Sequence, residues 1–118
     1  MVPSPFAAAA SFSGSPDQKS FFKYWRDYVP FDLENPQETR LRSPIEFPGS
    51  IRCPLFLFVS SYEEEFIEKN RKLANDCKKL GKTCNFFVVE GDHFTALPPS
   101  VEQSIPLFLQ VASAQQNE

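Results

Sequence analysis

Hydrophobic runs alternate with amphipathic segments along most of this chain. Two runs are apolar at nearly every position, residues 55–60 (LFLFVS) and residues 85–89 (NFFVV). Continuous apolar runs that are rich in Phe and Val are typical of strands covered on both faces, as parallel strands are. A third run, residues 6–12 (FAAAASF), precedes the turn signal SGSP at residues 13–16, which favours a strand there too. The pattern therefore predicts three buried strands.

The first predicted helix begins at Ser15, which is an N-cap candidate followed by Pro16, a favourable first helical residue. Gln18 stands where it can reach back to the cap. Pro30 is expected to end this helix. Its aromatic residues fall at helical spacing and predict one packed stripe, with the lining of a substrate site as the alternative: Phe21, Phe22, Trp25 and Tyr28.

Two further helices are predicted downstream. Residues 64–80 have acidic residues at the start, lysines at the end and Gly81 as a natural C′ residue. Their expected buried face is Phe66, Leu73, Cys77 and Leu80. The sequence SVEQ at residues 100–103 resembles a capping box that opens the last helix. Its expected buried face is Val101, Ile105, Phe108, Leu109 and Ala112, and residues 113–118 are expected to fray.

Strands that alternate with helices predict an α/β fold with three layers, in which a partial parallel sheet of about three strands is flanked by helices. Residues 29–50 are expected to be an irregular, proline-rich connection, with a short helix start at residues 42–45 (RSPI). Residues 1–118 form a single, incomplete domain in this interpretation. A sheet this thin leaves the FAAAASF strand as an apolar edge that favours a partner.

Composition narrows the function classes. The net charge of −3 and a pI near 5.2 argue against a nucleic-acid or anionic-membrane partner. No apolar run approaches the roughly 20 residues of a membrane span. The N-terminus has no Lys or Arg before its apolar stretch, so a cytoplasmic location is expected, although an apolar run ending in small residues also fits a signal peptide. The three cysteines, which lack CxxC spacing, are predicted to be free thiols: Cys53, Cys77 and Cys84. With a single histidine in the chain, neither a metal site nor a cofactor is expected.

Candidate chemistry follows two of the predicted strands. His93, in the sequence VEGDHF, comes directly after the 85–89 strand, and Glu63, Glu64 and Glu65 come after the 55–60 strand. Functional groups gather at the carboxyl ends of parallel strands, so these two loops are expected to lie side by side. A carboxylate beside an imidazole is the orienting pair of a catalytic triad. The alternative is that the three glutamates favour the helix N-terminus, each by about 0.3–1 kcal/mol, and that His93 is an ordinary loop residue.

The order of these motifs resembles the C-terminal part of an α/β-hydrolase, in the prolyl-oligopeptidase and dienelactone-hydrolase branch of serine hydrolases. The elements that carry the resemblance are RSPI, then IRCPLFLF with a following Glu, then NFFVVEGDHF and a final helix. AAAASFSGSPD is similar to the strand and turn after the nucleophile helix of that family. The resemblance extends from about residue 6 to residue 109 and implies that His93 is the catalytic base and Glu63 the acid. The family usually has Gly-x-x-Asp where this chain has Ser60-Ser61-Tyr62-Glu63, so Glu64 and Glu65 remain alternatives for the acid.

The expected nucleophile is missing from the sequence. A serine nucleophile in this fold lies on a G-x-S-x-G elbow, and no such pentapeptide occurs here. Ser13, in SFSGS, is the nearest imitation, and turn and cap chemistry is the favoured interpretation of it. The donors of an oxyanion hole would come from the same missing region. The isolated chain is therefore expected to have little hydrolase activity.

Two functions follow as hypotheses. The chain is the C-terminal portion of a peptidase or esterase, which supplies the base and the acid and needs an N-terminal complementary chain before it acts on a small ester or peptide. Alternatively, it is a non-catalytic α/β module that associates through its open sheet edge, with a second copy or with another chain.

Overall fold

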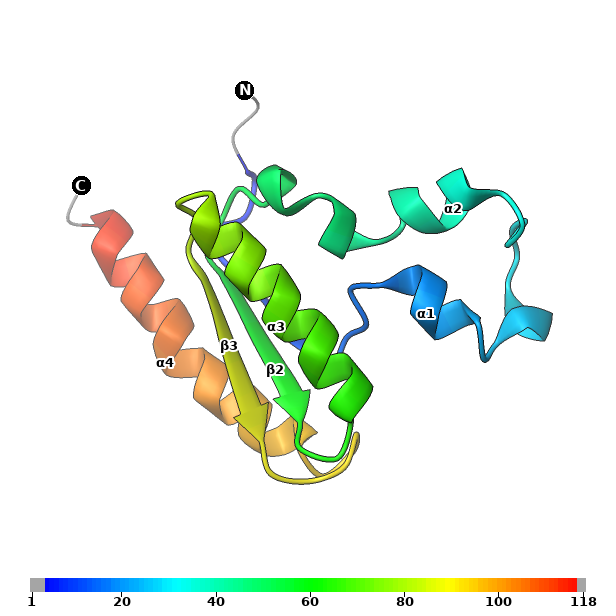
Figure 1. Cartoon of the computed structure of the whole chain (residues 1–118). Coiled ribbons are helices and arrows are strands. Elements are labelled where there is room, and N and C mark those ends of the chain that lie inside the picture. The colour runs from blue at the N-terminus through cyan, green and yellow to red at the C-terminus, as the bar shows by residue number, and fades with distance from the viewer. Residues whose placement is uncertain (1–3, 117–118) are drawn as a thin grey trace.

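A computed structural model describes residues 4–116 and contains a parallel sheet between two long helices (Figure 1). The three strands lie in the order β1 (Ala9–Phe12), β2 (Leu55–Ser60) and β3 (Cys84–Val89). The predicted α/β fold with a three-stranded parallel sheet is thereby confirmed. The α-helices are α1 (Gln18–Phe22), α2 (Pro36–Leu41), α3 (Glu64–Lys79) and α4 (Leu97–Gln116), and the 3₁₀ helices are η1 (Arg26–Tyr28), η2 (Pro44–Glu46) and η3 (Pro48–Ser50).

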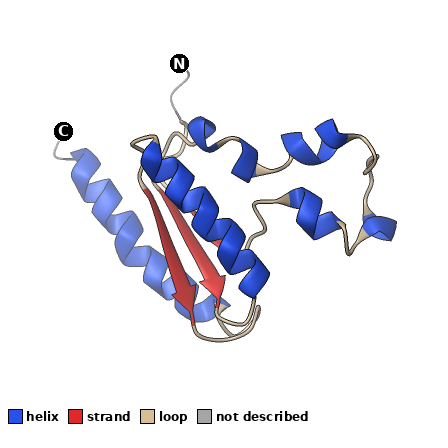
Figure 2. Cartoon of the chain, in the orientation of Figure 1, coloured by secondary structure: helices blue, strands red, loops and turns tan. Residues whose placement is uncertain are grey.

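The central strand β2 is covered on both faces, as its unbroken apolar run predicts (Figure 2). Leu57 faces α3 and packs in a cluster with Leu73 and Cys77 of that helix. Phe56 and Phe58 point to the opposite face, where they join a second cluster beneath α4. The two clusters make three layers, and they fix the strand because every second side chain fills a different core.

Helix α3 has nearly the predicted bounds. Gly81 follows it with a φ of +75°, and the amides of Gly81 and Lys82 donate to the carbonyls of Lys78 and Cys77, which closes the last turn. One part of the predicted buried face is wrong, because Leu80 is exposed at the C-cap while Asn70 and Ala74 are buried. The residues that α3 buries against the sheet therefore lie nearer the middle of the helix than the apolar pattern indicated.

Helix α4 corrects a larger prediction. It begins at Leu97, so Ser100 is an interior residue whose hydroxyl donates to the carbonyl of Ala96 at 2.6 Å, and it is not an N-cap. Pro98 and Pro99 fit the first turn because a proline there lacks an amide that would have no helical partner. Of the predicted buried face, Phe108 packs on the sheet, whereas the following members are exposed: Val101, Ile105, Leu109 and Ala112. Residues 113–116, predicted to fray, continue the helix, and residues 117–118 lie outside the described residues.

The connection between β1 and β2 extends away from the sheet as an arm of short helices (Figure 1). The predicted aromatic helix stops at Phe22, and its N-cap is Asp17 rather than Ser15. Asp17 accepts from the Ser20 amide and pairs with Lys69 of α3 at 2.9 Å. Although burial would raise the pKa of Asp17, the contacts with Lys69 and Ser20 lower it overall. The single aromatic stripe is wrong, since the aromatic residues beyond Phe22 belong to another turn and are exposed: Trp25 and Tyr28.

The proline-rich part of this arm is more ordered than the sequence predicted. Residues 29–50 contain α2, η2 and η3, each of which has a proline in its first turn. The helix start predicted at residues 42–45 is the turn η2, preceded by Ser43. The buried Ser43 hydroxyl donates to the Thr39 carbonyl at 2.6 Å and accepts from the Gln18 amide at 2.9 Å. Ser43 therefore ties α1 to α2.

Two of the three cysteines lie in the core beneath α3. Cys77 and Cys84 are buried free thiols, and Cys53 is a half-buried one. Burial raises the pKa of the Cys84 thiol to about 12, and the neighbouring Cys77 adds to that shift. Both core thiols are consequently held in the neutral form, which suits packing rather than nucleophilic chemistry. Among residues 4–116, no helix is both long enough and apolar enough to cross a membrane.

Candidate functional site

Two loops meet at the carboxyl end of the sheet. One follows β2 at residues 61–63, and the other follows β3 at residues 90–96. Ser61 joins them, because its amide donates to the Val89 carbonyl at 2.8 Å and its hydroxyl accepts from the Gly91 amide at 3.1 Å. The juxtaposition that the sequence predicted for these loops is therefore present, and it is fixed by one hydrogen bond of the Ser61 backbone and one of its side chain.

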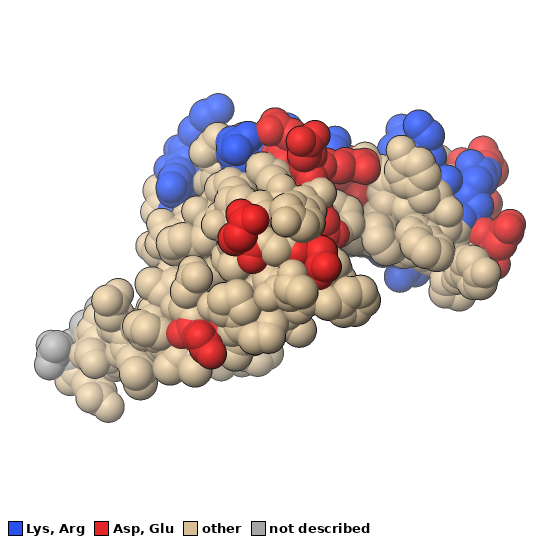
Figure 3. Space-filling view, turned by 90° about the horizontal axis from the view of Figure 1, so that it is seen from below, with Lys and Arg blue, Asp and Glu red and all other residues tan. Residues whose placement is uncertain are grey.

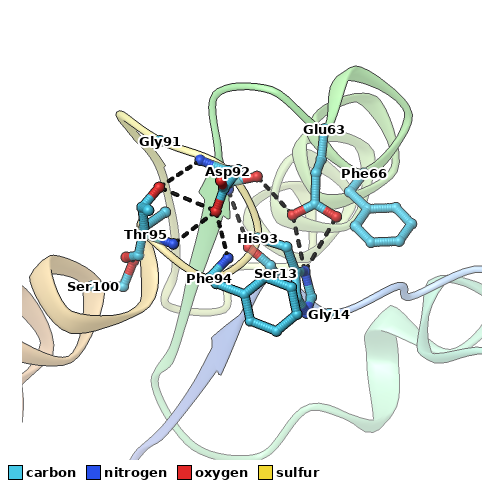
Figure 4. A network of polar contacts seen from close by, with 12 residues as sticks. Ser13, Gly14, Glu63, Phe66, Gly91, Asp92, His93, Phe94, Thr95 and Ser100 are labelled. Carbon is cyan, nitrogen blue, oxygen red and sulfur yellow. Dashed lines mark hydrogen bonds and ion pairs between the residues drawn. The ribbon is translucent and has the colours of Figure 1, made fainter.

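The loop that carries His93 is held by the residue before it. One oxygen of the Asp92 carboxylate accepts from the amides of Phe94 at 2.9 Å and Thr95 at 2.8 Å (Figure 4). These backbone hydrogen bonds, with Thr95 contributing most, lower the pKa of Asp92. Thr95 completes the turn, since its hydroxyl accepts from the Asp92 amide at 2.8 Å. Asp92 thus shapes the loop, and the hydrogen bonds described for its carboxylate go to Phe94 and Thr95.

Gly91 is required by the geometry of the same turn. Its φ of +129° lies in a region that side chains other than glycine rarely adopt. A β-carbon at this position would lie 2.5 Å from the Thr95 hydroxyl oxygen and 3.1 Å from the Ala96 amide nitrogen. The turn therefore requires glycine at position 91 for structural reasons, whether or not the loop has a catalytic role.

His93 and Glu63 form a side-chain pair across the two loops (Figure 4). The imidazole Nδ1 lies 3.1 Å from one carboxylate oxygen of Glu63 and 3.3 Å from the other. Ser60 donates its hydroxyl to the nearer oxygen at 2.6 Å, so that oxygen has two partners. The Glu63 side chain is 22% exposed and that of His93 is 51% exposed. The carboxylate is therefore the sheltered member of the pair, and the ring reaches solvent.

The three candidate acids are distinguished by position. Glu63 occupies the N-cap of α3 but makes no capping hydrogen bond with its side chain, which turns toward His93 instead. Glu64 and Glu65 lie in the first turn of the helix and are exposed. Among the described contacts, Glu63 is the glutamate that meets the imidazole. The other two fit the alternative interpretation, in which negative charge stabilises a helix N-terminus.

Ser13 lies in the turn after β1 with a φ of +53°, which is unusual for a residue other than glycine. Its amide donates to the Phe58 carbonyl at 2.7 Å, and its hydroxyl oxygen accepts from the Ser60 amide at 3.1 Å. The hydroxyl thus extends the pairing of β1 with β2 by one more bond. No hydrogen bond joins Ser13 to His93 among the residues that the structure describes.

Three positioning residues were not singled out in the sequence. Ser60 fixes the carboxylate, Ser61 joins the loops, and the buried Asn70 donates to the carbonyls of Gly14 at 2.9 Å and Phe66 at 2.8 Å. Asn70 thereby holds the β1 turn against α3. A signal existed for Ser60, because Ser-x-x-Glu before a helix is a capping-box pattern. Asn70 had no comparable signal, since a polar residue within a helix is usually exposed.

A ligand-sized pocket lies away from the pair. A pocket of about 660 Å³ lies at the opposite, amino end of the strands, lined in part by residues 51–54 and 82–83. Within residues 4–116, no group of three or more His, Cys, Asp or Glu side chains could hold a metal ion. Acid–base chemistry at the carboxyl end of the sheet depends on the His93–Glu63 pair.

The pair can orient a general base. A carboxylate accepts hydrogen bonds, so the contact with Glu63 requires the proton of a neutral imidazole to be on Nδ1. Nε2 is then the nitrogen with a free lone pair, and it belongs to the half-exposed ring. This is the state in which a histidine removes a proton from a nucleophile.

No protein-family model, no curated protein and no solved structure matches this chain.

Proposed function

We propose that this chain supplies the base and the acid of a serine-hydrolase active site whose nucleophile comes from another polypeptide segment. The observation that carries the proposal is the contact of 3.1 Å between His93 Nδ1 and a Glu63 carboxylate oxygen. The order of motifs that resembles α/β-hydrolases supports the same function. In this proposal His93 is the general base and Glu63 orients it.

The proposed reaction is acyl transfer from a small ester or peptide. Nε2 of His93 takes the proton of a serine hydroxyl while the serine oxygen bonds to the carbonyl carbon, and the same nitrogen returns the proton to the leaving group. Glu63 holds the ring in place and stabilises the imidazolium while it carries the extra proton. Ser60 restrains Glu63 through its hydrogen bond of 2.6 Å.

The missing partner is expected to arrive beside β1. The nucleophile and the oxyanion donors of this fold class lie on a strand and turn, and β1 is an edge strand with β2 as its hydrogen-bonded neighbour. The Ser13 hydroxyl is engaged with the Ser60 amide, so Ser13 serves the turn in this proposal. The chain alone is expected to lack acyl-transfer activity, because oxyanion donors alone contribute about 10²–10³-fold.

A fluorophosphonate probe, which reacts with activated serines, tests the proposal. The tagged chain is recovered with its associated polypeptides from its own source and treated with the probe, beside the variants His93→Ala and Glu63→Gln. The expected result is a labelled serine on an associated polypeptide, with labelling lost in His93→Ala and reduced at least tenfold in Glu63→Gln. Ser113→Ala, an exposed change on α4, is the matched control and is expected to leave labelling unchanged.

Two results would contradict the proposal. Labelling of an associated serine to the same extent with His93→Ala would show that the base comes from elsewhere. Covalent labelling of Ser13 in the isolated chain would show that this chain carries its own nucleophile. A reading frame for G-x-S-x-G next to the coding region, or in frame with it, would identify the expected partner directly.

The second candidate function is a non-catalytic module that binds a strand at its open edge. The observation that favours it is the position of β1, where backbone groups on one side face away from β2. The amides of Ala9 and Ser13 donate to the carbonyls of Pro54 and Phe58, on the side of β2, so the alternation of a parallel strand turns the amide of Ala10 to the open side. If this edge is the binding site, Ala10→Pro abolishes association while leaving the β1–β2 bonds in place.

A further inference from the structure

Phe94 is a large apolar residue that the fold leaves beside the proposed base. It directly follows His93 and is 79% exposed. The phenyl and imidazole rings meet edge to face, with 5.3 Å between their centroids and 86° between their planes. In Figure 4 the phenyl ring lies beside the imidazole, on the side away from Glu63. Phe94 is therefore next to the part of the imidazole that Glu63 leaves open.

The backbone of Phe94 is held in place, although its side chain reaches solvent. Its amide donates to the Asp92 carboxylate at 2.9 Å, and its carbonyl accepts from the Leu97 amide at 3.3 Å. Ala96 is the residue of this loop that fills the core, with none of its surface exposed. Single exposed apolar residues are common on protein surfaces. This one differs because a rigid turn fixes it against the imidazole, while the core contact of the loop is made by another residue.

The charges around the pair favour a neutral ligand. Figure 3 shows the molecule from the carboxyl end of the strands: acidic side chains lie in the middle of this face among uncharged ones, and the Lys and Arg side chains lie toward its margins. A negatively charged group would be repelled here. Residues 61–65 and 90–96 include neither Lys nor Arg, and their acidic residues are Glu63, Glu64, Glu65, Glu90 and Asp92.

The proposed reaction brings the leaving group of the substrate to the same place. When the tetrahedral intermediate collapses, the bond between the carbonyl carbon and the leaving oxygen or nitrogen breaks, and Nε2 of His93 gives that atom the proton that it took from the serine. The leaving atom is then within hydrogen-bond reach of Nε2. The rest of the leaving group extends over the residues beside the imidazole, and Phe94 is one of them.

We propose that Phe94 selects substrates whose leaving group carries a neutral aromatic ring. This inference rests on the proposed function, because it needs a serine that His93 activates. Aromatic rings attract one another in edge-to-face and offset-stacked contacts, and the exposed ring of Phe94 is open to both. A small leaving group makes no such contact, and a negatively charged one meets the acidic residues. Phe94 determines specificity here, while His93 and Glu63 keep their proposed roles.

Two phosphonate probes that differ only in their leaving group test the inference. Both transfer the same tagged phosphonyl group to an activated serine, but one releases fluoride and the other releases phenol. The affinity-tagged chain, recovered with its associated polypeptides, is treated with each probe, and the two labelling rates are expressed as a phenyl-to-fluoride ratio. The ratio cancels differences in the amount of associated polypeptide between variants.

Phe94→Ala is expected to lower the phenyl-to-fluoride ratio at least about fivefold, because the aromatic contact is lost. Phe94→Tyr keeps a ring at this position and is expected to keep the ratio. Phe6→Ala is the matched control, since Phe6 is 69% exposed and lies beside the pocket at the amino end of the strands. It is expected to leave the ratio unchanged, and circular dichroism checks that each variant is folded.

The contrary results separate the inference from the proposed function. If the fluoride probe labels no serine in the wild-type sample, the proposed function and the inference that rests on it are both overturned. If the fluoride probe labels a serine but Phe94→Ala has the wild-type ratio, the inference alone is overturned. A Phe94→Ala variant that reacts more slowly with both probes, by the same factor, would also overturn it, because Phe94 would then act on the base and not on the leaving group.

Discussion

At the scale of single residues, the candidate site depends on a glutamate that does not cap its own helix. N-cap side chains usually accept from an amide of the first helical turn, but the Glu63 carboxylate accepts from Ser60 and contacts His93 instead. Ser60 in turn is fixed through its amide, which donates to Ser13. A single line of polar contacts thus runs from the β1 turn through Ser60 and Glu63 to the imidazole.

The first prediction concerns Ser13. Ser60 is fully buried, so Ser13→Ala leaves its amide without the acceptor that it has now. The free energy of unfolding is expected to fall by about 1–3 kcal/mol, as measured by urea denaturation. Ser113→Ala, at an exposed position on α4, is expected to change it by less than about 0.5 kcal/mol. Equal stability of the two variants would remove the structural role assigned to Ser13.

The sequence revealed the two central residues of the site and missed their supports. His93 is the one histidine of the chain and directly follows a strand, and Glu63 follows the neighbouring strand, so topology was enough to bring them together. The sequence indicates only strand and loop at Ser60, because the role of this residue depends on where the Glu63 side chain points. A side-chain direction of that kind is decided by the neighbouring loop, which lies about thirty residues away in sequence.

At the scale of elements, the loop between β3 and α4 is the one that positions His93. It turns sharply at Gly91, is closed by the Asp92 carboxylate and leads directly into the first turn of α4. The lowered pKa of Asp92 means that this carboxylate stabilises the fold above about pH 4. That contribution is lost as the pH falls through the lowered pKa of Asp92 and the carboxylate takes up a proton.

The second prediction concerns Gly91. Gly91→Ala forces a β-carbon against Thr95 and a side chain into a φ of +129°, so we expect unfolding to be easier by about 1–3 kcal/mol or more. Gly49→Ala is the control, because a β-carbon there meets only Leu80, at an ordinary 3.9 Å. Thermal and urea unfolding of both variants measure the difference. If Gly91→Ala unfolds like Gly49→Ala, the turn does not need its glycine.

The elements that the sequence predicted well are those with both a core face and an end signal. Strands β2 and β3 and helix α3 have long apolar patterns, and Gly81 marks the end of α3. The start of helix α4 was predicted wrongly, because SVEQ at residues 100–103 has the sequence of a capping box although the helix already begins at Leu97, just before Pro98. The predicted start of the aromatic helix was wrong because of a tertiary contact. Lys69 of α3 pairs with Asp17 and fixes the N-cap two residues after Ser15.

At the scale of the whole molecule, the chain has two kinds of open surface. The β1 edge offers unpaired backbone groups, and one flank of α4 offers apolar side chains, whereas the outer face of α3 is charged. In the proposed function the edge receives the segment with the nucleophile. Neither surface touches the His93–Glu63 pair, which lies between loops of this chain alone. The orientation of His93, the proposed base, should therefore be complete before any partner binds.

The tautomer of His93 tests that orientation most directly. Long-range ¹H–¹⁵N spectra of the isolated chain, recorded where the imidazole is neutral, report which ring nitrogen bears the proton, and the single histidine makes the assignment unambiguous. The account predicts a proton on Nδ1 and a bare Nε2 in the wild type, with this preference weakened in Glu63→Gln. A proton on Nε2 in the wild type, or identical spectra for the two proteins, would show that Glu63 does not orient His93.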